Sequence, residues 1–300
     1  MNKFQIFIDS CGEMPRELRE PYGVEAIPMT LTVNGKDDIK EYPALIDYDG
    51  EYDFKGFYDA MRNGLRFKTA AINAAGFEPY FRAVLEKGMD ILYLACSSGL
   101  SISVKEAAKL AEKLKGEFPN AKIYCIDTLT SGFSIADMAI TARNMEKEGK
   151  TIDEIAAHIE SVKQKYNQFA TVENLNYLKD AGRVTASSAF FGNLFRVAPI
   201  IISDVKGHNV AMVKVKGRKA ALDKCVELAA EAAEDAANRT VYIAHGDCEA
   251  DAAYLKSKVE EIIKPKNIII GKIGPIIGAS SGPGVISIYV YGKEVTFCGE

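Results

Sequence analysis

Short apolar runs alternate with longer amphipathic stretches through the first half of the chain. The short runs are typical of buried strands, and the longer stretches place apolar residues at helical spacing. The predicted strands and extended segments are Phe4–Ile8, Val24–Val33, Asp90–Cys96 and Lys122–Ile126, and the predicted helices are Asp53–Leu65, Phe77–Lys87, Ser101–Gly116 and Gly132–Gly149. This alternation predicts a mostly parallel sheet covered by helices on both faces.

The second half continues the mixture of strands and helices. The predicted helices are Thr151–Tyr166, Lys219–Asn238 and Ala250–Ile263, and the predicted strands are Pro199–Ser203, Val210–Val215, Thr240–Ala244, Asn267–Ile270 and Val285–Val290. A length of 300 residues corresponds to about two domains. We therefore predict two α/β domains with mostly parallel sheets, 1–150 and 151–300, that meet near Gly149–Thr151.

Composition narrows the class of protein. Hydrophobic residues make up 48% and charged residues 26%, which is enough apolar material for one or two cores and argues against disorder. The net charge of −4 and the lack of a basic block exclude a nucleic-acid-binding surface. The most apolar tract, Asn267–Tyr291, is broken by Lys272 and several glycines and prolines, so no membrane span is expected. The N-terminus shows no secretory pattern, and the expected location is the cytoplasm.

Hydroxyl groups follow several predicted strands, where open α/β sheets bind their ligands. Asp9 and Ser10 follow the first strand, Ser97, Ser98 and Ser101 follow the strand Asp90–Cys96, and Thr69 precedes a helix. Such a cluster beside a helix N-terminus can hold a carboxylate or phosphate through neutral hydrogen bonds. The residues alone leave ligand binding and ordinary turn chemistry equally open. Ser103, three residues before Glu106, is predicted to be a helix N-cap.

The sequence gives little support for any of the known catalytic or cofactor-binding motifs. The three histidines lack metal-ligand spacing, and neither a dinucleotide-binding nor a P-loop motif occurs, so no metal or cofactor is expected. Gly278–Gly282 formally matches the G-x-S-x-G elbow, but no helix follows it. We predict instead a flexible glycine-rich turn at Ser280, Ser281 and Gly282 that approaches a ligand.

Two further segments carry candidate binding groups. Arg183 follows Gly182 after a short predicted helix and could pair with an anion, although a surface arginine after a helix C-cap is the ordinary interpretation. The segment Ala189–Phe195 contains three phenylalanines. It is either a core helix or the lining of an apolar ligand site.

Ten short motifs, in this order and spacing, resemble those of the DegV family, the bacterial fatty-acid-binding proteins that serve fatty acid kinase. They are Ile8–Ser10, Ile27–Met29, Lys68-Thr69, Ser97–Ser101, Cys125–Thr128, Tyr177–Arg183, Pro199-Ile200, Lys216–Lys219, Ile273–Gly278 and Gly282–Gly284. The resemblance extends over nearly the whole chain.

The resemblance implies two α/β domains with one long-chain fatty acid in the cleft between them. It implies that Thr69 and Ser97, Ser98 or Ser101 hold the carboxylate, and it places the family arginine at Arg183. Proteins of this family are carriers rather than enzymes, and they present the carboxylate to a separate kinase that makes an acyl phosphate for phospholipid synthesis.

The chain departs from the family pattern at several positions. Ala70–Ile72 replaces S-Q-P, Ile102-Ser103 replaces G-T, Ala198 replaces a lysine, and Ser280 stands where the family has a histidine. The loss of this histidine leaves fatty-acid binding better supported than partnership with a kinase. The alternatives are a serine hydrolase that uses Ser280 and His245, and a sensor of a non-lipid small molecule in the same cleft.

Overall fold

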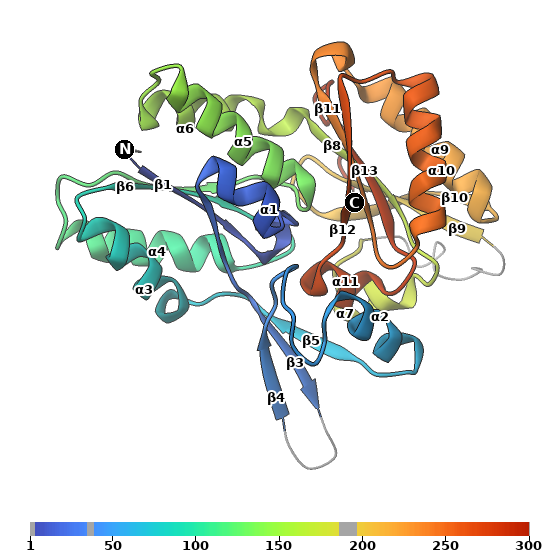
Figure 1. Ribbon diagram of the computed structural model, residues 1–300, viewed down its shortest axis with the longest axis horizontal. Coiled ribbons are helices and arrows are strands. Elements are labelled where there is room, and N and C mark those ends of the chain that lie inside the picture. The colour runs from blue at the N-terminus through green and yellow to red at the C-terminus, as the bar shows by residue number, and fades with distance from the viewer. Residues whose placement is uncertain (1–3, 35–38, 186–196, 300) are drawn as a thin grey trace.

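A four-stranded parallel sheet forms the centre of the first part of the molecule (Figure 1). The computed structural model describes residues 4–34, 39–185 and 197–299. The strand order is β2-β1-β6-β7, with β1 at Phe4–Asp9, β2 at Val24–Ile27, β6 at Asp90–Ala95 and β7 at Ile123–Asp127. All neighbouring pairs are parallel, which confirms the prediction for this half. The carboxyl ends of the strands therefore meet at one edge.

Helices cover both faces of this sheet, as predicted (Figure 1). One face carries α3 (Ala74–Leu85) and α4 (Ser103–Lys115), and the other carries α5 (Phe133–Lys147) and α6 (Ile152–Val162). The side chains of Thr151 and Glu154 form a capping box that begins α6. Helix α5 also contacts the second sheet, where the ring of Phe133 stacks on that of Tyr242 with centroids 5.2 Å apart.

The second part contains a six-stranded mixed sheet. The strand order is β10-β9-β8-β13-β11-β12, with β8 at Tyr166–Thr171, β9 at Val197–Ser203, β10 at Asn209–Lys216, β11 at Thr240–His245, β12 at Asn267–Lys272 and β13 at Ile286–Tyr291. Only β11 and β12 pair in parallel; the other neighbouring pairs are antiparallel. The α/β class is confirmed, but a mostly parallel second sheet was the wrong prediction.

Strand β8, which the sequence pattern did not predict, explains this error. The sequence pattern assigned its first residue to the end of a helix, whereas the helix stops at Val162 and all six residues of β8 are buried. Strand β8 enters the sheet between β9 and β13 and runs antiparallel to both. Helices α9 (Arg218–Ala232) and α10 (Glu249–Ile262) cover the outer face of the sheet (Figure 1). Helix α9 ends at Ala232, six residues before the predicted boundary at Asn238.

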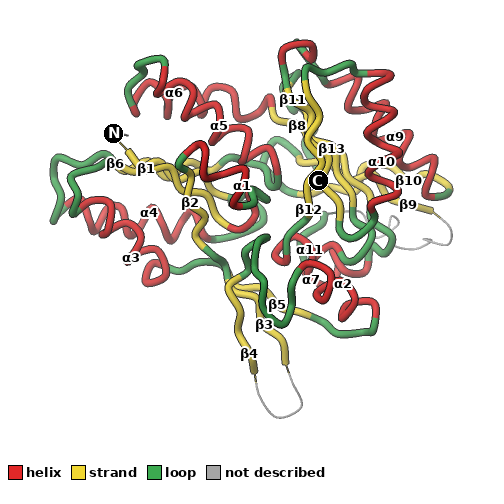
Figure 2. The backbone as a smooth tube through the Cα atoms, in the orientation of Figure 1, coloured by secondary structure: helices red, strands yellow, loops and turns green. Residues whose placement is uncertain are grey.

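A small antiparallel sheet, β4-β3-β5, projects from the junction of the two parts (Figure 2). Its strands are β3 (Thr30–Asn34), β4 (Ile39–Pro43) and β5 (Phe67–Ala70). The extended segment predicted at Val24–Val33 is in fact two strands in different sheets, because the backbone leaves the first sheet at Pro28.

Helix α2 (Phe54–Arg62) belongs to the first half of the sequence but packs on the second part, against α11 (Pro275–Ser281). The hydroxyl of Tyr58 donates to the backbone oxygen of Ile273 at 2.8 Å, and Arg62 forms an ion pair with Asp247. The other α-helices within the described residues are α1 (Arg16–Arg19) and α7 (Asn176–Ala181). The two-domain division near residue 150 stays a prediction, and α2 lies with the second part.

Two hydrophobic cores hold these layers together. The larger core runs from the four-stranded sheet through α5 and α2 to the inner face of the second sheet, and so includes residues of both halves. The smaller core lies between the outer face of the six-stranded sheet and the helices α9 and α10. Because the larger core is continuous, buried residues of both halves share one packed interior.

Candidate ligand-binding site

A small, largely apolar cavity lies at the junction and is lined by both halves of the chain. Its volume is about 70 Å³. The lining residues are Cys11, Met29, Thr69, Ala70, Ala71, Cys96, Leu100, Ser101, Ser131, Leu178, Arg183, Asn209, Ile276, Ile277 and Ser280. We call it the inner cavity. An apolar lining with a few polar groups is the usual composition of a small-molecule site.

A second and larger cavity, of about 390 Å³, adjoins the first. We call it the outer cavity. Both cavities are lined by Thr69, Arg183 and Ser280, so these three residues lie where the two cavities meet, and we call this place the passage. The outer cavity also has Arg66, Lys68, Tyr177 and Asp180 on its walls. The junction thus combines an apolar interior with a charged opening.

Three of the predicted hydroxyl residues, Thr69, Ser101 and Ser280, line the inner cavity. Thr69 lies on the edge strand β5, and Ser101 lies in the loop before α4. The hydroxyl oxygen of Ser101 is 3.0 Å from that of Ser103, which accepts a hydrogen bond from the backbone N–H of Ile72 at 3.1 Å. The N-cap position of α4 is Ile102, so the prediction of Ser103 as the cap is wrong. Ser103 instead ties the loop after β5 to the start of α4.

Ser97 and Ser98 line neither cavity. The hydroxyl oxygen of the fully buried Ser97 accepts from the N–H of Gly99 at 3.1 Å, and the N–H of Ser98 donates to a carboxylate oxygen of Asp127 at 3.0 Å. These bonds fix the loop that carries Ser101. Direct contact of Ser97 or Ser98 with a ligand stays a prediction.

Asp9 and Ser10 also act on the cavity through other residues. The carboxylate of Asp9 is fully buried and accepts from the N–H groups of Cys11 and Cys96 and from the hydroxyl of Tyr93, at 2.8–2.9 Å. Burial raises the pKa of Asp9 although these hydrogen bonds oppose it. Ser10 accepts from the N–H of Met29 at 2.8 Å. Cys11, Cys96 and Met29 all line the inner cavity, so Asp9 and Ser10 shape its wall.

The segment that contains Ser280 is helical, which corrects the prediction of a flexible turn. Helix α11 begins with Pro275 at its first position, a common helix start, and ends at Ser281, with Gly282 as its C-cap at a φ of 81°. Ser280 lines both cavities, while the buried Ser281 donates to the backbone oxygen of Ile277 at 2.7 Å. Gly282 lines neither cavity. The short length of the helix, together with its glycine and serines, concealed it in the sequence.

A buried carboxyl group secures the start of α11. Glu13 accepts a hydrogen bond from the N–H of Gly274, the N-cap of the helix. Its side chain is buried, its other oxygen has no partner within the described part of the chain, and burial raises its pKa to about 8. Glu13 therefore links the end of β1 to the helix that bears Ser280.

Arg183 is held beside the passage by backbone groups. Its Nε donates to the backbone oxygen of Leu100 at 3.3 Å and its Nη1 to that of Ala181 at 2.6 Å. Its guanidinium forms no ion pair with any carboxylate of the described residues. A positioned arginine that lacks a protein counter-ion is suited to bind an anion.

Two polar residues of the inner cavity, Ser131 and Asn209, were not predicted from the sequence. The buried amide of Gln168 joins them, because its nitrogen donates to Asn209 Oδ1 at 2.7 Å and its oxygen accepts from the Ser131 hydroxyl at 3.4 Å. Asn209 in turn donates to the backbone oxygen of Arg183 at 3.2 Å. No sequence motif indicates Ser131 or Asn209 as site residues. Their link depends on Gln168, which lies on the unpredicted strand β8.

The structure offers no support for a serine hydrolase. The Ser280 hydroxyl donates to the backbone oxygen of Ile276 at 3.5 Å, and His245 Nδ1 accepts from the N–H of Cys248 at 3.3 Å. His245 lines neither cavity. Among the described residues, no cluster of three or more His, Cys, Asp or Glu could hold a metal ion. No helix among the described residues is both long enough and apolar enough to span a bilayer.

Comparison with known proteins identifies the family. A family model described as "Uncharacterised protein, DegV family" matches residues 3–293. The chain belongs to the DegV family. The DegV domain-containing protein CPE0026 of Clostridium perfringens is 30% identical over 292 residues, which cover 97% of this chain and 98% of that protein.

Solved structures of DegV proteins share the fold. The DegV lipid-binding protein of Thermotoga maritima superposes with a TM-score of 0.84 at 24% identity, over 98% of this chain and all of that one. DegV of Bacillus subtilis, a fatty-acid-binding protein, gives a TM-score of 0.82 at 23% identity with the same coverage. The aromatic segment Ala189–Phe195 lies outside the described residues, so its predicted role is untested.

Proposed function

We propose that this DegV protein binds one long-chain fatty acid at the junction of its two parts. The carboxylate lies at the passage between the cavities, within reach of Thr69, Ser101, Arg183 and Ser280, and the acyl chain enters the inner cavity. The observation that carries this proposal is the joint lining of an apolar cavity by these hydroxyls and by Arg183, which forms no ion pair with a carboxylate of the described residues. The lipid-binding neighbours from T. maritima and B. subtilis support it.

The energetics favour an apolar tail. Each buried methylene contributes about 0.8 kcal/mol, so the tail supplies most of the affinity and the head group mainly sets orientation. A volume of about 70 Å³ is enough for roughly five water-sized groups. A long chain therefore requires side chains of the lining to move, and the lining includes Leu178, Ile276 and Ile277 on the short helices α7 and α11.

Native mass spectrometry of the purified protein, followed by titration with hexadecanoate, tests the proposal. We expect a bound lipid mass or one-to-one uptake. The double variant Thr69→Val with Ser101→Ala loses two neutral hydrogen bonds and should bind at least about fivefold more weakly. Thr32→Val, in the same small sheet but outside both cavities, is the matched control. A bare polypeptide that takes up no lipid would refute the proposal.

We also propose that the bound carboxylate is presented to a fatty acid kinase. The open outer cavity supports this, because it gives a partner access to the passage. A fatty acid kinase supplied with ATP and the lipid-loaded protein should release ADP. Ser280→His, which restores the residue of the family pattern, should raise that rate. If ADP release is equal with and without the loaded protein, the kinase role fails and the carrier role stands.

A further inference from the structure

Three sulfur-bearing side chains, Cys11, Met29 and Cys96, line the inner cavity. We call these three residues the sulfur cluster. The sulfur atoms of Cys11 and Met29 are 3.9 Å apart, and the thiols of Cys11 and Cys96 are in hydrogen-bond contact. All three side chains are buried, so they can meet a ligand only from the inner cavity. Cys11 therefore contacts both of the other sulfur atoms at the edge of one small cavity.

The fold brings the sulfur cluster together from distant parts of the chain. Cys11 follows β1 and Cys96 follows β6, and these strands are parallel neighbours, so both cysteines lie at the same edge of the sheet. The carboxylate of Asp9 accepts from the backbone N–H groups of both cysteines, and Ser10 accepts from that of Met29. Hydrogen bonds to neighbouring groups are what hold the ligands of metal sites in place. Because the three positions are far apart in the sequence, no metal-ligand spacing could indicate them.

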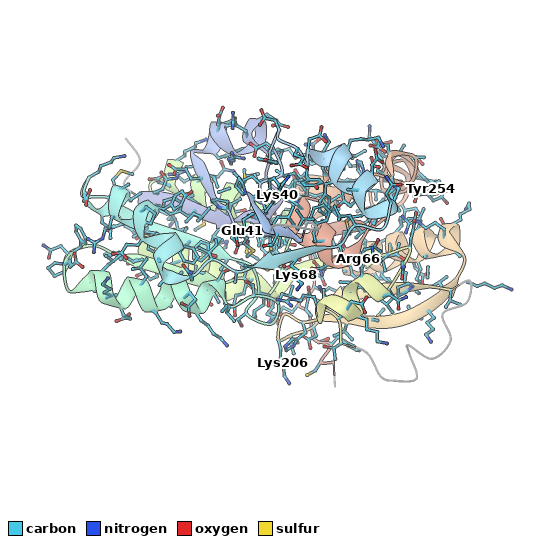
Figure 3. All side chains as sticks on the ribbon, turned by 90° about the horizontal axis from the view of Figure 1, so that it is seen from below. Lys40, Glu41, Arg66, Lys68, Lys206 and Tyr254 are labelled. Atoms are coloured by element: carbon cyan, nitrogen blue, oxygen red, sulfur yellow. The ribbon has the colours of Figure 1, made fainter. Side chains whose placement is uncertain are left out.

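Acidic groups lie close to the sulfur cluster. Contact with Cys96 and burial raise the pKa of the Cys11 thiol, and the carboxyl groups of Asp9 and Glu13 raise it further. Several lysines, by contrast, are exposed at the surface; those labelled in Figure 3 are Lys40, Lys68 and Lys206. The Cys11 thiol therefore keeps its proton in the metal-free protein. A bound metal cation reverses this preference, because it deprotonates the thiols that coordinate it.

We propose that Cys11, Cys96 and Met29 form a binding site for one soft monovalent metal cation of the Cu(I) type. Thiolate and thioether sulfurs are the ligands that Cu(I) prefers, whereas structural Zn²⁺ sites require four ligands. With metal–sulfur bonds of about 2.3 Å, the ligands of a planar three-coordinate site lie about 4.0 Å apart, close to the 3.9 Å between the sulfurs of Cys11 and Met29. On binding, the two thiol protons pass to solvent and the metal keeps its oxidation state.

The inner cavity gives a metal ion both room and a route to the sulfur cluster. Its volume is about 70 Å³, and it meets the outer cavity at the passage. The described residues contain no cluster of three His, Cys, Asp or Glu side chains that could hold a metal, and here the thioether of Met29 takes the third place. This site goes beyond the proposed lipid binding and does not depend on it.

Titration of the purified protein with Cu(I) under anaerobic conditions, against a chromogenic Cu(I) chelator, tests the site. We expect the protein to withdraw one equivalent of Cu(I) from the chelator. Cys11→Ser and Cys96→Ser each remove a thiolate ligand and should weaken binding at least about a hundredfold. Met29→Leu keeps the side-chain volume, removes only the thioether and should weaken binding about tenfold. The controls are Met61→Leu in the larger core and Cys298→Ser at an exposed thiol, since neither residue lines the inner or outer cavity.

X-ray absorption at the copper edge gives a second readout, which a purely structural role of these residues would not change. The wild type should show three sulfur neighbours at about 2.3 Å, and Met29→Leu should show two. A wild type that takes no Cu(I) from the chelator overturns the inference. So does copper content that falls only in Cys298→Ser, because the exposed thiol then holds the metal.

Met29→Leu decides the question even if the serine variants fail to fold. If it keeps both the affinity and the number of sulfur neighbours of the wild type, the three-sulfur site is refuted. Uptake of hexadecanoate is measured separately on the same protein. Failure of the metal site therefore leaves fatty-acid binding intact, and failure of fatty-acid binding leaves the metal site to be decided by copper alone.

Discussion

The buried carboxyl of Glu13 predicts a specific dependence of stability on pH. Its pKa rises from 4.5 to about 8 in the folded protein, mainly because burial penalises the charged form. The ionisable groups that face it include Asp9, Tyr58, Tyr289 and Cys11, none of which can carry a positive charge. Between pH 4.5 and about 8 the native protein therefore holds a proton that the unfolded chain releases.

The sign and size of the effect follow from this difference. The contribution of Glu13 to stability is fully present below pH 4.5 and falls as the pH rises to about 8. At 1.36 kcal/mol for each pH unit, the free energy of unfolding falls by about 3 kcal/mol at pH 7 and by about 5 kcal/mol once the group ionises. The variant Glu13→Gln keeps an acceptor for the N–H of Gly274 and cannot ionise, so it should escape this loss.

Urea denaturation of the wild type and of Glu13→Gln at pH 5, 7 and 8.5 measures the difference. The free energy of unfolding of the variant should exceed that of the wild type by an amount that grows with pH. The exposed Glu17, four residues away, provides the control Glu17→Gln, whose pH profile should follow the wild type. If the profiles of Glu13→Gln and the wild type stay parallel from pH 5 to 8.5, the assignment of a protonated carboxyl at neutral pH is refuted.

Three other substitutions probe the support of the site. Asp9→Ala leaves three buried donors without their acceptor and should lower the free energy of unfolding by at least about 3 kcal/mol, measured in urea; a loss below 1 kcal/mol would contradict this. Gly282→Ala places a Cβ 2.5 Å from the ring of Tyr177 at a φ of 81° and should lower Tm, whereas an unchanged Tm would show that the helix end tolerates a side chain. Ser103→Ala frees the N–H of Ile72, so that amide should exchange hydrogen faster than in the wild type; equal exchange rates would show that this bond is not retained in solution.

Sequence patterns predicted the parallel half of the fold well because its central strands are almost wholly apolar. Strand β6 (Asp90–Ala95) buries five of its six residues completely, and after Asp90 its only polar group is the hydroxyl of Tyr93. Strand β8 is equally buried but contains Asn167, Gln168 and Thr171, which gave it the appearance of a solvent-exposed segment. The amide groups of Asn167 and Gln168 form hydrogen bonds with distant parts of the chain, and these partners cannot be read from local sequence.

The residues of the candidate site also differ in whether the sequence could predict them. Thr69, Ser101, Arg183 and Ser280 could be placed from strand ends and family motifs, and all four line the inner cavity. Asn209 could not, because it reaches the cavity through the pairing of two antiparallel strands and through its bond to Gln168. The positioning roles of Asp9 and Ser10 also required the fold, since each acts on residues brought close by the sheet.

Helix α2 belongs to the first half of the sequence but is buried against the second half, so the protein cannot be cut between the halves without exposing apolar surface. The apolar face of this helix, formed by Phe57, Tyr58 and Met61, is buried in the larger core next to Ile273 and Ile276 of the second half. A fragment that stops at residue 150 would expose this face to water, and the complementary fragment would lack the surface that covers α11. Cutting the chain near residue 150 should therefore destabilise both fragments, because each would lose apolar surface that the other covers.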